Sequence, residues 1–254
     1  MKNIFFICVF SLIAFTGCTD DDELYKNSGK DSAEEETSFP NEEIDQRLFK
    51  VINLDYPGLE QVKAWYETGN YYSASKALLE YYRGRIGIIN PYVSLNSITT
   101  QQARYAELAL AENGYRFYIN ANYLEEKDLG NGKEKVPYSL KSGKEINWEF
   151  IPKGADKEYR KQLHRHNWIP FQAMAYQKTQ DEIYMLGWKD VYSDWVSKFP
   201  KTETVVDEFA WWQLQVSTRL MGQAQAFEYF KFSSNFTPQW ISFFLVHFAD
   251  HADF

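Results

Sequence analysis

The residues best suited to chemistry lie in one short segment, Glu158 to Trp168, the densest polar and aromatic stretch of the sequence. If this segment is a helix, His164 and Trp168 stand four positions apart on one side, and Lys161 lies on a neighbouring face. Such a surface would offer a cation, an imidazole and an indole together. A charged sugar needs these groups, because cations pair with carboxylate or sulfate and a flat ring covers the apolar sugar face. The alternative is that Trp168 packs inward and the bases form a solvated face.

A second cluster of the same kind runs from Trp211 to Arg219. On a helix, Trp212, Gln215 and Arg219 fall on one stripe at positions i, i+3 and i+7. This stripe could line the same cleft as the first cluster, or it could be part of the packing.

Metal and nucleotide chemistry have little support in the sequence. His164 and His166 are two positions apart, so their rings point away from each other on a helix. His247 and His251, four apart, could form a two-histidine face, but the intervening acid of a zinc-protease motif is missing. There is no nucleophile-elbow, phosphate-binding or dinucleotide motif. We therefore expect no metal, no cofactor and no nucleic-acid partner.

The elements that must position these clusters are predicted to be helices. Apolar residues recur at spacings of three and four from Leu59 to Tyr66 and from Tyr72 to Tyr82, with Gly69-Asn70 as the turn between the two runs. Pro200 is expected to end one later helix, and Thr237-Pro238 to open another. Further helices are expected near residues 100–112, 157–178, 181–198, 208–230 and 238–253.

No stretch alternates over the length of a strand, and residues 86–96 and 127–155 are predicted to be long loops. Loops of this size in a compact domain are more often functional than idle. We predict an all-α fold, an array of antiparallel helical hairpins that forms a toroid or a solenoid. No fixed-period repeat decides for the solenoid.

The net charge of −8 is concentrated near the N-terminus. Ten acids against two lysines give residues 19–43 a charge of −8, and Lys2 adds +1, so the 44–254 region sums to −1. An acidic surface repels polyanions. Because the predicted folded body is nearly neutral, a polyanionic ligand remains allowed.

The first 17 residues are predicted to be a lipoprotein signal peptide. The apolar run from Ile4 to Phe15 is too short to cross a bilayer as a helix. It ends in Phe15-Thr16-Gly17-Cys18, which matches a lipobox, so Cys18 is the expected lipidation site. A plain cleaved signal with an incidental cysteine is the alternative. Residues 18–43 are expected to be an acidic flexible tether, and residues 44–254 the folded domain.

Acidic residues 20–23 follow Cys18 directly and resemble a signal that exports lipoproteins to the outer face of the outer membrane. We expect an outer-membrane lipoprotein that faces the cell surface and is held to the membrane by its lipid. A solvated spacer is the other interpretation of this acidic run.

Several blocks of sequence together resemble the heparinase II/III family, nearest to its heparinase III (heparan-sulfate lyase) branch. The resemblance spans about residues 48–254, and the blocks occur in the same order and spacing. They are Ile52 to Leu59, Gly69 to Tyr71, Ala77 to Arg83, Ile146 to Trp148, Gln162 to Trp168, Tyr192 to Trp195, Trp212 to Arg219 and Phe236 to Pro238. This resemblance implies an incomplete α/α toroid, in agreement with the helical periodicity.

The family resemblance also implies β-elimination on an acidic polysaccharide such as heparan sulfate or heparin. In that family an Asn neutralises the uronate carboxylate, and a Tyr and a His act as base and acid. The matching positions follow the Phe236-Thr237-Pro238 block and lie beyond Phe254. Asn235 precedes the block and is not the matching Asn. We therefore expect the N-terminal toroid part of a longer lyase, truncated at its C-terminal end and inactive alone.

The residues expected to line a substrate cleft are His164, Arg165, Asn167, Trp168, Gln172, Trp212, Gln215 and Arg219, although the family blocks could equally be packing. A non-catalytic, glycan-binding lipoprotein of the outer membrane is the alternative function. A helical scaffold for a protein partner is a third possibility, and it predicts no saccharide binding.

Overall fold

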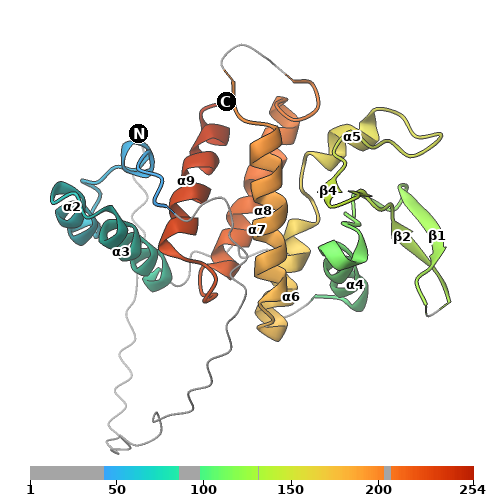
Figure 1. Cartoon of the computed structure of the whole chain (residues 1–254), viewed down its shortest axis with the longest axis horizontal. Coiled ribbons are helices and arrows are strands. Elements are labelled where there is room, and N and C mark those ends of the chain that lie inside the picture. The colour runs from blue at the N-terminus through green and yellow to red at the C-terminus, as the bar shows by residue number, and fades with distance from the viewer. Residues whose placement is uncertain (1–42, 86–97, 131, 203–206) are drawn as a thin grey trace, which may run out of the picture. The chain divides into compact units, whose positions relative to one another are not determined.

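The computed structural model describes residues 43–85, 98–130, 132–202 and 207–254, which belong to one compact unit. This part of the chain is mostly helical, as predicted (Figure 1). The helices are α1 (Leu48–Val51), α2 (Glu60–Glu67), α3 (Tyr71–Gly84), α4 (Thr100–Leu108), the 3-10 helix η1 (Ala111–Asn113), α5 (Glu158–Leu163), α6 (Ile169–Thr179), α7 (Ile183–Lys198), α8 (Gln213–Phe230) and α9 (Pro238–Ala252).

The first hairpin is formed by α2 and α3, which pack against each other. Gly69 in the turn has a φ of 74°, a left-handed conformation that glycine adopts because it has no Cβ. The side chain of Asn70 caps α3 by accepting a hydrogen bond from the backbone N–H of Ser73 at 3.0 Å. The predicted hairpin and its turn are confirmed.

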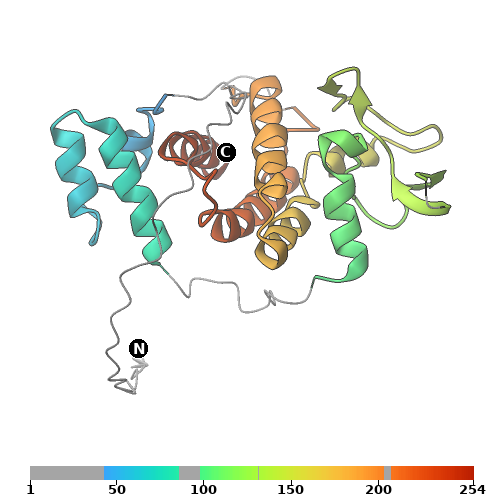
Figure 2. The same ribbon diagram turned by 60° about the horizontal axis from the view of Figure 1, so that its bottom comes forward.

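Four longer helices form the central packing: α6 lies against α7 and α8, and α8 lies against α9 (Figures 1 and 2). Their core is rich in tryptophan, with Trp168, Trp188, Trp195 and Trp240 almost fully buried. Large buried aromatic rings supply much apolar surface: Trp168 caps α6, Trp188 and Trp195 are on α7, and Trp240 is on α9. Aromatic rings that are distant in sequence, such as Trp188 and Trp240, therefore pack these helices together.

The start of α9 is joined to the first hairpin by contacts distant in sequence. Thr237 caps α9 by accepting a hydrogen bond from the N–H of Trp240 at 3.1 Å, and Pro238 is in the first turn, as predicted. The carbonyl of Pro238 accepts a hydrogen bond from the Ser75 hydroxyl of α3 at 2.6 Å. The hydroxyl of Ser242 accepts one from the N–H of Asp45 at 2.9 Å. The first half of α9 is thus tied to the N-terminal elements.

The predicted helix over residues 157–178 is two helices, because α5 ends at Leu163 and α6 begins at Ile169. Pro170 has no N–H to donate and a fixed φ, so it favours the first turn of a new helix over the middle of an old one. The predicted helices at 100–112 and 208–230 are also shorter, running over Thr100–Leu108 and Gln213–Phe230.

The prediction that residues 127–155 form a loop is partly wrong. Strand β1 (Leu124–Asp128) pairs antiparallel with β2 (Lys133–Pro137), and β3 (Lys141–Ser142) with β4 (Glu145–Ile146). The first pair carries mostly charged side chains, such as Lys133 and Glu126 at 3.4 Å across the strands, so apolar alternation does not reveal it. The second predicted loop, 86–96, lies outside the described residues.

The predicted signal peptide and tether also lie outside the described residues, except for Glu43. Within the described ranges, no helix combines the length and the apolar character needed to cross a bilayer.

Candidate functional site

His164 and Trp168 do not share a helix, so the predicted helical face that carries both rings is wrong. His164 is the C-terminal cap of α5 and Trp168 the N-terminal cap of α6. His166, between them, has a φ of 57°, in the left-handed region that non-glycine residues rarely adopt. Residues 164–168 therefore form a tight connection between two helices, called the α5–α6 connection below.

Three predicted site residues on and after this connection are fully buried. Trp168 stacks on Phe117 with parallel rings whose centroids are 4.0 Å apart. His164 has no exposed surface, and burial, reinforced by the nearby Arg219, holds its pKa well below the ordinary value. Gln172 is packed beside Gly187 of α7, where a Cβ would lie 3.4 Å from its amide nitrogen. These side chains support the fold in the described structure.

Arg219 of α8 is also fully buried, and each of its three guanidinium nitrogens donates a hydrogen bond to a neutral group. Its Nε donates to His251 Nε2 at 2.7 Å, its Nη1 to the carbonyl of His164 at 2.5 Å, and its Nη2 to the carbonyl of Ala210 at 3.0 Å. The guanidinium lies 4.1 Å from the ring centre of Trp195, a cation–π contact. Burial lowers the pKa of Arg219 to about 9, so the side chain still carries its charge at neutral pH.

The predicted stripe of Trp212, Gln215 and Arg219 is not formed. Trp212 precedes the helix as its cap, with an extended backbone, and 51% of its side chain is exposed. Gln215 is buried and donates its amide hydrogen to the carbonyl of Glu208 at 3.0 Å. One residue of the three therefore faces solvent and two face the interior.

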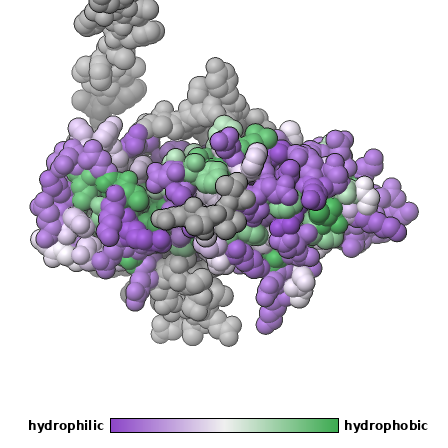
Figure 3. Space-filling model, turned by 90° about the horizontal axis from the view of Figure 1, so that it is seen from above, coloured by the Kyte–Doolittle hydropathy of each residue, from purple (hydrophilic) through white to green (hydrophobic). Residues whose placement is uncertain are grey.

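The basic residues around α5 are paired with acids. Arg165 lies 2.8 Å from Glu158, and Lys161 lies 3.7 Å from Glu208. Arg160 forms an ion pair with Glu149. On the face drawn in Figure 3, hydrophilic side chains surround smaller hydrophobic patches. The cations around α5 that the sequence offers for an anionic ligand are thus already balanced by local carboxylates in this structure.

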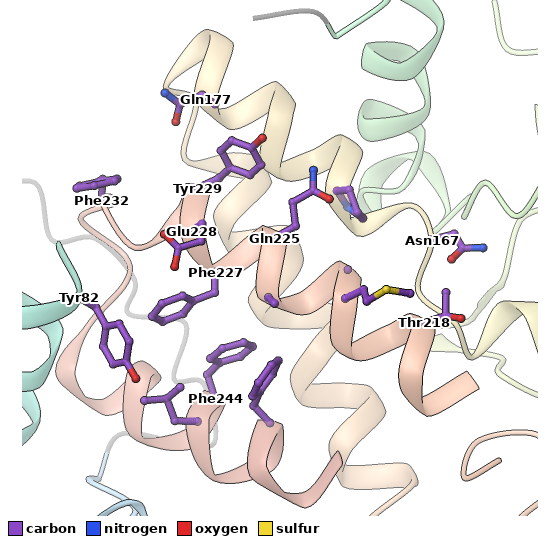
Figure 4. Close-up of a pocket in the computed structure, with 16 residues that line it drawn as sticks. Tyr82, Asn167, Gln177, Thr218, Gln225, Phe227, Glu228, Tyr229, Phe232 and Phe244 are labelled. Carbon is purple, nitrogen blue, oxygen red and sulfur yellow. The ribbon is translucent and has the colours of Figure 1, made fainter. Parts of the chain in front are cut away.

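The structure contains a cavity of about 700 Å³ that the sequence did not predict. We call this cavity the α8–α9 groove, because one outer face of α8 and the second half of α9 line most of it. The remaining wall comes from Asn167, Pro170 and Gln177 of the α5–α6 region and from Tyr82 of α3. In the view of Figure 4, Tyr82, Phe227 and Phe244 gather in one region, Gln177 and Tyr229 in a second, and Asn167 and Thr218 lie on the opposite side from Tyr82. The groove is mostly apolar, with a few amide and hydroxyl groups.

Of the eight predicted site residues, Asn167 lines the groove. The groove instead exposes apolar side chains, above all Met221, at 68% exposure, and Phe232, at 51%. A sequence signal for this surface existed in α8, whose apolar residues occur on more than one side of the helix. A helix that is apolar on several sides is one that several partners cover.

His247 and His251, considered above as a metal-binding pair, make hydrogen bonds within the fold instead. The Nδ1 of His247 lies 3.1 Å from a carboxylate oxygen of Asp250. His251 engages both ring nitrogens, Nε2 with Arg219 and Nδ1 with the carbonyl of His247. In the described part of the chain, no three histidine, cysteine or acidic side chains are grouped closely enough to hold a metal ion.

Comparison with known proteins decides the family. A family model described as the heparinase II/III N-terminus matches residues 48–254. The chain belongs to the heparinase II/III family. Its incomplete toroid of helical hairpins is the fold of solved members: over 83% of this chain and 31% of the other, it matches a crystal structure of heparinase III with a TM-score of 0.74 and 49% identity.

Relatives of this family member carry an assigned activity. A heparin-sulfate lyase of Bacteroides thetaiotaomicron is 49% identical over 255 residues, which cover all of this chain and 36% of the relative. One from Pedobacter heparinus is 34% identical, covering 83% of this chain and 31% of the relative. A crystal structure of a heparan sulfate lyase from Pedobacter heparinus matches with a TM-score of 0.68, 33% identity and coverage of 82% and 31%. The chain spans about a third of the length of these relatives.

Proposed function

We propose that this chain is the N-terminal toroid part of a lyase that cleaves heparan sulfate or heparin by β-elimination. The observation that carries the proposal is the 49% identity to a heparin-sulfate lyase along the whole chain, together with the matching fold. Identity at this level over the length of the chain supports a shared scaffold, and the proposed substrate class follows from the relatives' names.

The chemistry of β-elimination states what such a lyase must supply. A base removes the proton on C5 of the uronic acid, the bond from C4 to the glycosidic oxygen breaks, an acid protonates the leaving oxygen, and a 4,5-unsaturated uronate remains. The C5 proton is weakly acidic while the carboxylate beside it is charged, so that charge must be neutralised as the intermediate forms. We propose that the Asn, Tyr and His for these roles follow residue 254 in the longer enzyme. Residues 1–254 alone are then inactive.

We propose that this part of the enzyme contributes saccharide contacts from those predicted site residues that are at least partly exposed. Arg165, Asn167 and Trp212 retain solvent access, whereas the other predicted cleft residues are buried. An exposed indole such as that of Trp212 can stack on a sugar ring, and Arg165 can exchange its carboxylate partner for a sulfate. The buried residues His164, Trp168, Gln172, Gln215 and Arg219 hold the scaffold that presents these contacts.

The α8–α9 groove fits the same proposal. A mostly apolar groove between long helices, with Met221 exposed in it, is the kind of surface that a further helix covers. We propose that the rest of the longer lyase packs here as the toroid continues.

The experiment that tests the function compares two proteins on heparan sulfate: this 254-residue chain and the longer lyase. Ultraviolet absorbance of the unsaturated uronate reports the reaction. We expect product from the longer lyase and none from the short chain. Binding of heparan sulfate by both, with product from neither, would replace the lyase with the alternative of a glycan-binding lipoprotein. No binding by either would leave a scaffold role.

We further propose that the protein is an outer-membrane lipoprotein, lipidated on Cys18 and facing the cell surface. The lipobox and the acidic residues after it support this location. Radiolabelled palmitate should enter the wild-type protein and not the Cys18→Ala variant, and external protease should digest the protein on intact cells. Label in neither protein, or protection from protease, would contradict lipidation or surface exposure respectively.

A further inference from the structure

Three of the four histidines of the chain are buried around one buried cation. His164 and His166 lie on the α5–α6 connection, His251 is on the last turn of α9, and Arg219 is on α8. Each histidine is at most 4% exposed, and Arg219 is fully buried. We call these three histidines and Arg219 the histidine cluster.

His251 is held as one neutral tautomer. Its Nδ1 lies 2.6 Å from the carbonyl oxygen of His247, which can only accept, so Nδ1 carries the proton. Its Nε2 lies 2.7 Å from Nε of Arg219, which can only donate, so Nε2 presents its lone pair. A second proton on His251 would have to sit on Nε2, where it would break the bond to Arg219 and face a positive charge.

His164 is held as the opposite tautomer. Its Nδ1 accepts a hydrogen bond from Nε1 of Trp195 at 3.0 Å, and an indole nitrogen only donates. The proton of the neutral His164 ring is therefore on Nε2.

His166 is fixed in the same way by a relay. The amide oxygen of Gln223 accepts from Nε1 of Trp188 at 2.8 Å, which leaves the amide nitrogen to face Nδ1 of His166 at 3.2 Å. Since that nitrogen donates, Nδ1 of His166 accepts and its Nε2 carries the proton. Protonation of either His164 or His166 would cost one of these hydrogen bonds.

The charged groups around the histidine cluster oppose protonation. Burial, then the charge of Arg219, lowers the pKa of His164, His166 and His251 well below the ordinary value. Further cationic or titratable neighbours are Arg160 near His164, and His247 and Lys201 near His251. The phenol of Tyr192 is the titratable group that faces Arg219. The three hydrogen bonds from the Arg219 side chain go to a neutral imidazole and two backbone carbonyls, none of which is a carboxylate.

The two ends of α9 are held by different chemistry. Its first half is tied by hydrogen bonds that do not titrate near neutral pH, those of Ser75 and Ser242 with the backbone. Its last turn is held by His251, which bonds to Arg219 and packs on Trp211 and Trp195 with ring centroids 4.9 and 5.5 Å apart. A proton can therefore act on the last turn without acting on the first.

We propose that the histidine cluster is an acid-sensitive latch, in which protonation of His251 releases the last turn of α9 from α8 before the rest of the domain unfolds. Protonation of His251 removes one acceptor from Arg219 and places two cations side by side. It loosens the α5–α6 connection next, because the carbonyl of His164 shares the same guanidinium. This inference rests on the hydrogen-bond geometry and does not depend on the proposed lyase activity.

The tautomers can be read directly, because the chain has four histidines. Long-range proton–nitrogen NMR of histidine-labelled protein at pH 7 should show His251 protonated on Nδ1, and His164 and His166 on Nε2. A proton on Nε2 of His251, or a charged His251 ring at pH 7, would overturn the latch, and this measurement needs no variant.

Hydrogen exchange then tests the release. We expect the equilibrium constant for opening of residues 248–252 to rise about tenfold for each pH unit below 6.5, because opening takes up one proton. This constant is the measured exchange rate divided by the intrinsic rate. Amides of α2 and α3 should remain better protected than those of residues 248–252 over the same range. In His251→Gln, whose side-chain oxygen can still accept from Arg219 but takes up no proton, the rise should disappear.

The matched control is His247→Gln, the same substitution one turn earlier on α9. The backbone carbonyl at position 247, which holds His251, is unchanged in this variant, so the acid release should persist. Simultaneous opening of residues 248–252 and of α2 and α3 would overturn the local latch. So would a rise that survives in His251→Gln.

Discussion

Glu182, at the N-terminal cap of α7, accepts a hydrogen bond from the side-chain amide of Asn235 at 2.9 Å. The same carboxylate accepts one from the hydroxyl of Ser233. Arg83 of α3 reaches the same turn, with its Nε 2.7 Å from the carbonyl of Lys231 and its Nη2 3.0 Å from that of Ser233. The turn between α8 and α9 is thus fixed by an anion from one helix and a cation from another.

Replacing Glu182 with alanine should lower the free energy of unfolding by about 1–3 kcal/mol, because the Asn235 amide and the Ser233 hydroxyl lose a charged acceptor. Urea denaturation followed by tryptophan fluorescence measures this change. Burial raises the pKa of Glu182, but hydrogen bonds from Asn235 and Ser233 outweigh it and leave the net pKa below the ordinary value. The carboxylate's contribution is therefore present at neutral pH and is lost as the pH falls through the folded-state pKa.

The control for this prediction is Glu67→Ala. Glu67 is exposed and lies 3.9 Å from Lys63, a surface pair that should change the unfolding free energy by less than about 0.5 kcal/mol. Equal losses in the two variants would refute the role of the carboxylate in fixing the turn.

The two tryptophans that the sequence offered as sugar platforms should behave oppositely. Trp168→Ala removes a fully buried ring stacked on Phe117 and should cost about 3–5 kcal/mol of stability. Trp212→Ala removes a half-exposed ring and should leave stability within about 1 kcal/mol. Thermal unfolding of both variants distinguishes packing from binding.

In the longer lyase that we propose, Trp212→Ala should weaken heparan-sulfate binding by up to about tenfold, the loss expected for one stacking contact. Titration calorimetry with a heparan-sulfate oligosaccharide measures it, and Tyr72→Ala, which truncates a similarly exposed ring on α3, is the control. Equal affinities for wild type and Trp212→Ala would remove Trp212 from the proposed contacts.

The helices could be predicted because their signals are local. Each signal involves residues only a few positions apart in the chain. Examples are the apolar spacing of α2 and α3, the turn at Gly69-Asn70 and the cap at Thr237. The predicted helix over residues 157–178 does not contain the break between α5 and α6, although Pro170 marks it. His166 there has a left-handed backbone, and its ring faces the amide of Gln223, 57 positions further along the chain.

The candidate site could be predicted only in part, because burial is set by long-range contacts. Arg219 looks like a surface cation in its own segment, but it is enclosed by His164, 55 positions away, and His251, 32 positions away. The α8–α9 groove likewise joins Tyr82 of α3 to residues beyond position 200. No spacing rule within one segment could place these side chains inside or outside.

The stability of the domain should fall as the pH drops below about 6.5. His164, His166 and His251 have folded-state pKa values well below 6.5, lowered by burial and then by Arg219, so the unfolded chain binds more protons in this range. Each such histidine contributes a slope of about 1.4 kcal/mol per pH unit. Their stabilising contribution is complete above pH 6.5 and is lost as the pH falls toward their folded values.

Urea titrations between pH 8 and 5 should therefore show unfolding free energy flat above pH 7 and decreasing by up to about 4 kcal/mol per pH unit below 6.5, from three protons. His166→Gln should reduce this slope by the contribution of one proton, about 1.4 kcal/mol per pH unit, if the variant folds. An unfolding free energy that stays constant down to pH 5 would mean that the three rings take up protons in the native state as readily as in the unfolded chain.

The exposed apolar side chains of the α8–α9 groove should promote self-association of the 254-residue chain. Met221→Gln and Phe232→Ser remove two of them and should shift the protein toward monomer in sedimentation velocity, with stability changes within about 0.5 kcal/mol. Tyr72→Ser, an equally exposed aromatic residue outside the groove, should leave the distribution unchanged.

The longer lyase should respond in the opposite way, because there we propose that further helices cover the groove. Met221→Gln would place an amide in an apolar interface without a partner, and should lower the free energy of unfolding by about 1–3 kcal/mol. Urea denaturation of the longer protein measures this loss. An unchanged stability there would mean that the groove stays open to solvent, since an exposed methionine tolerates glutamine at little cost.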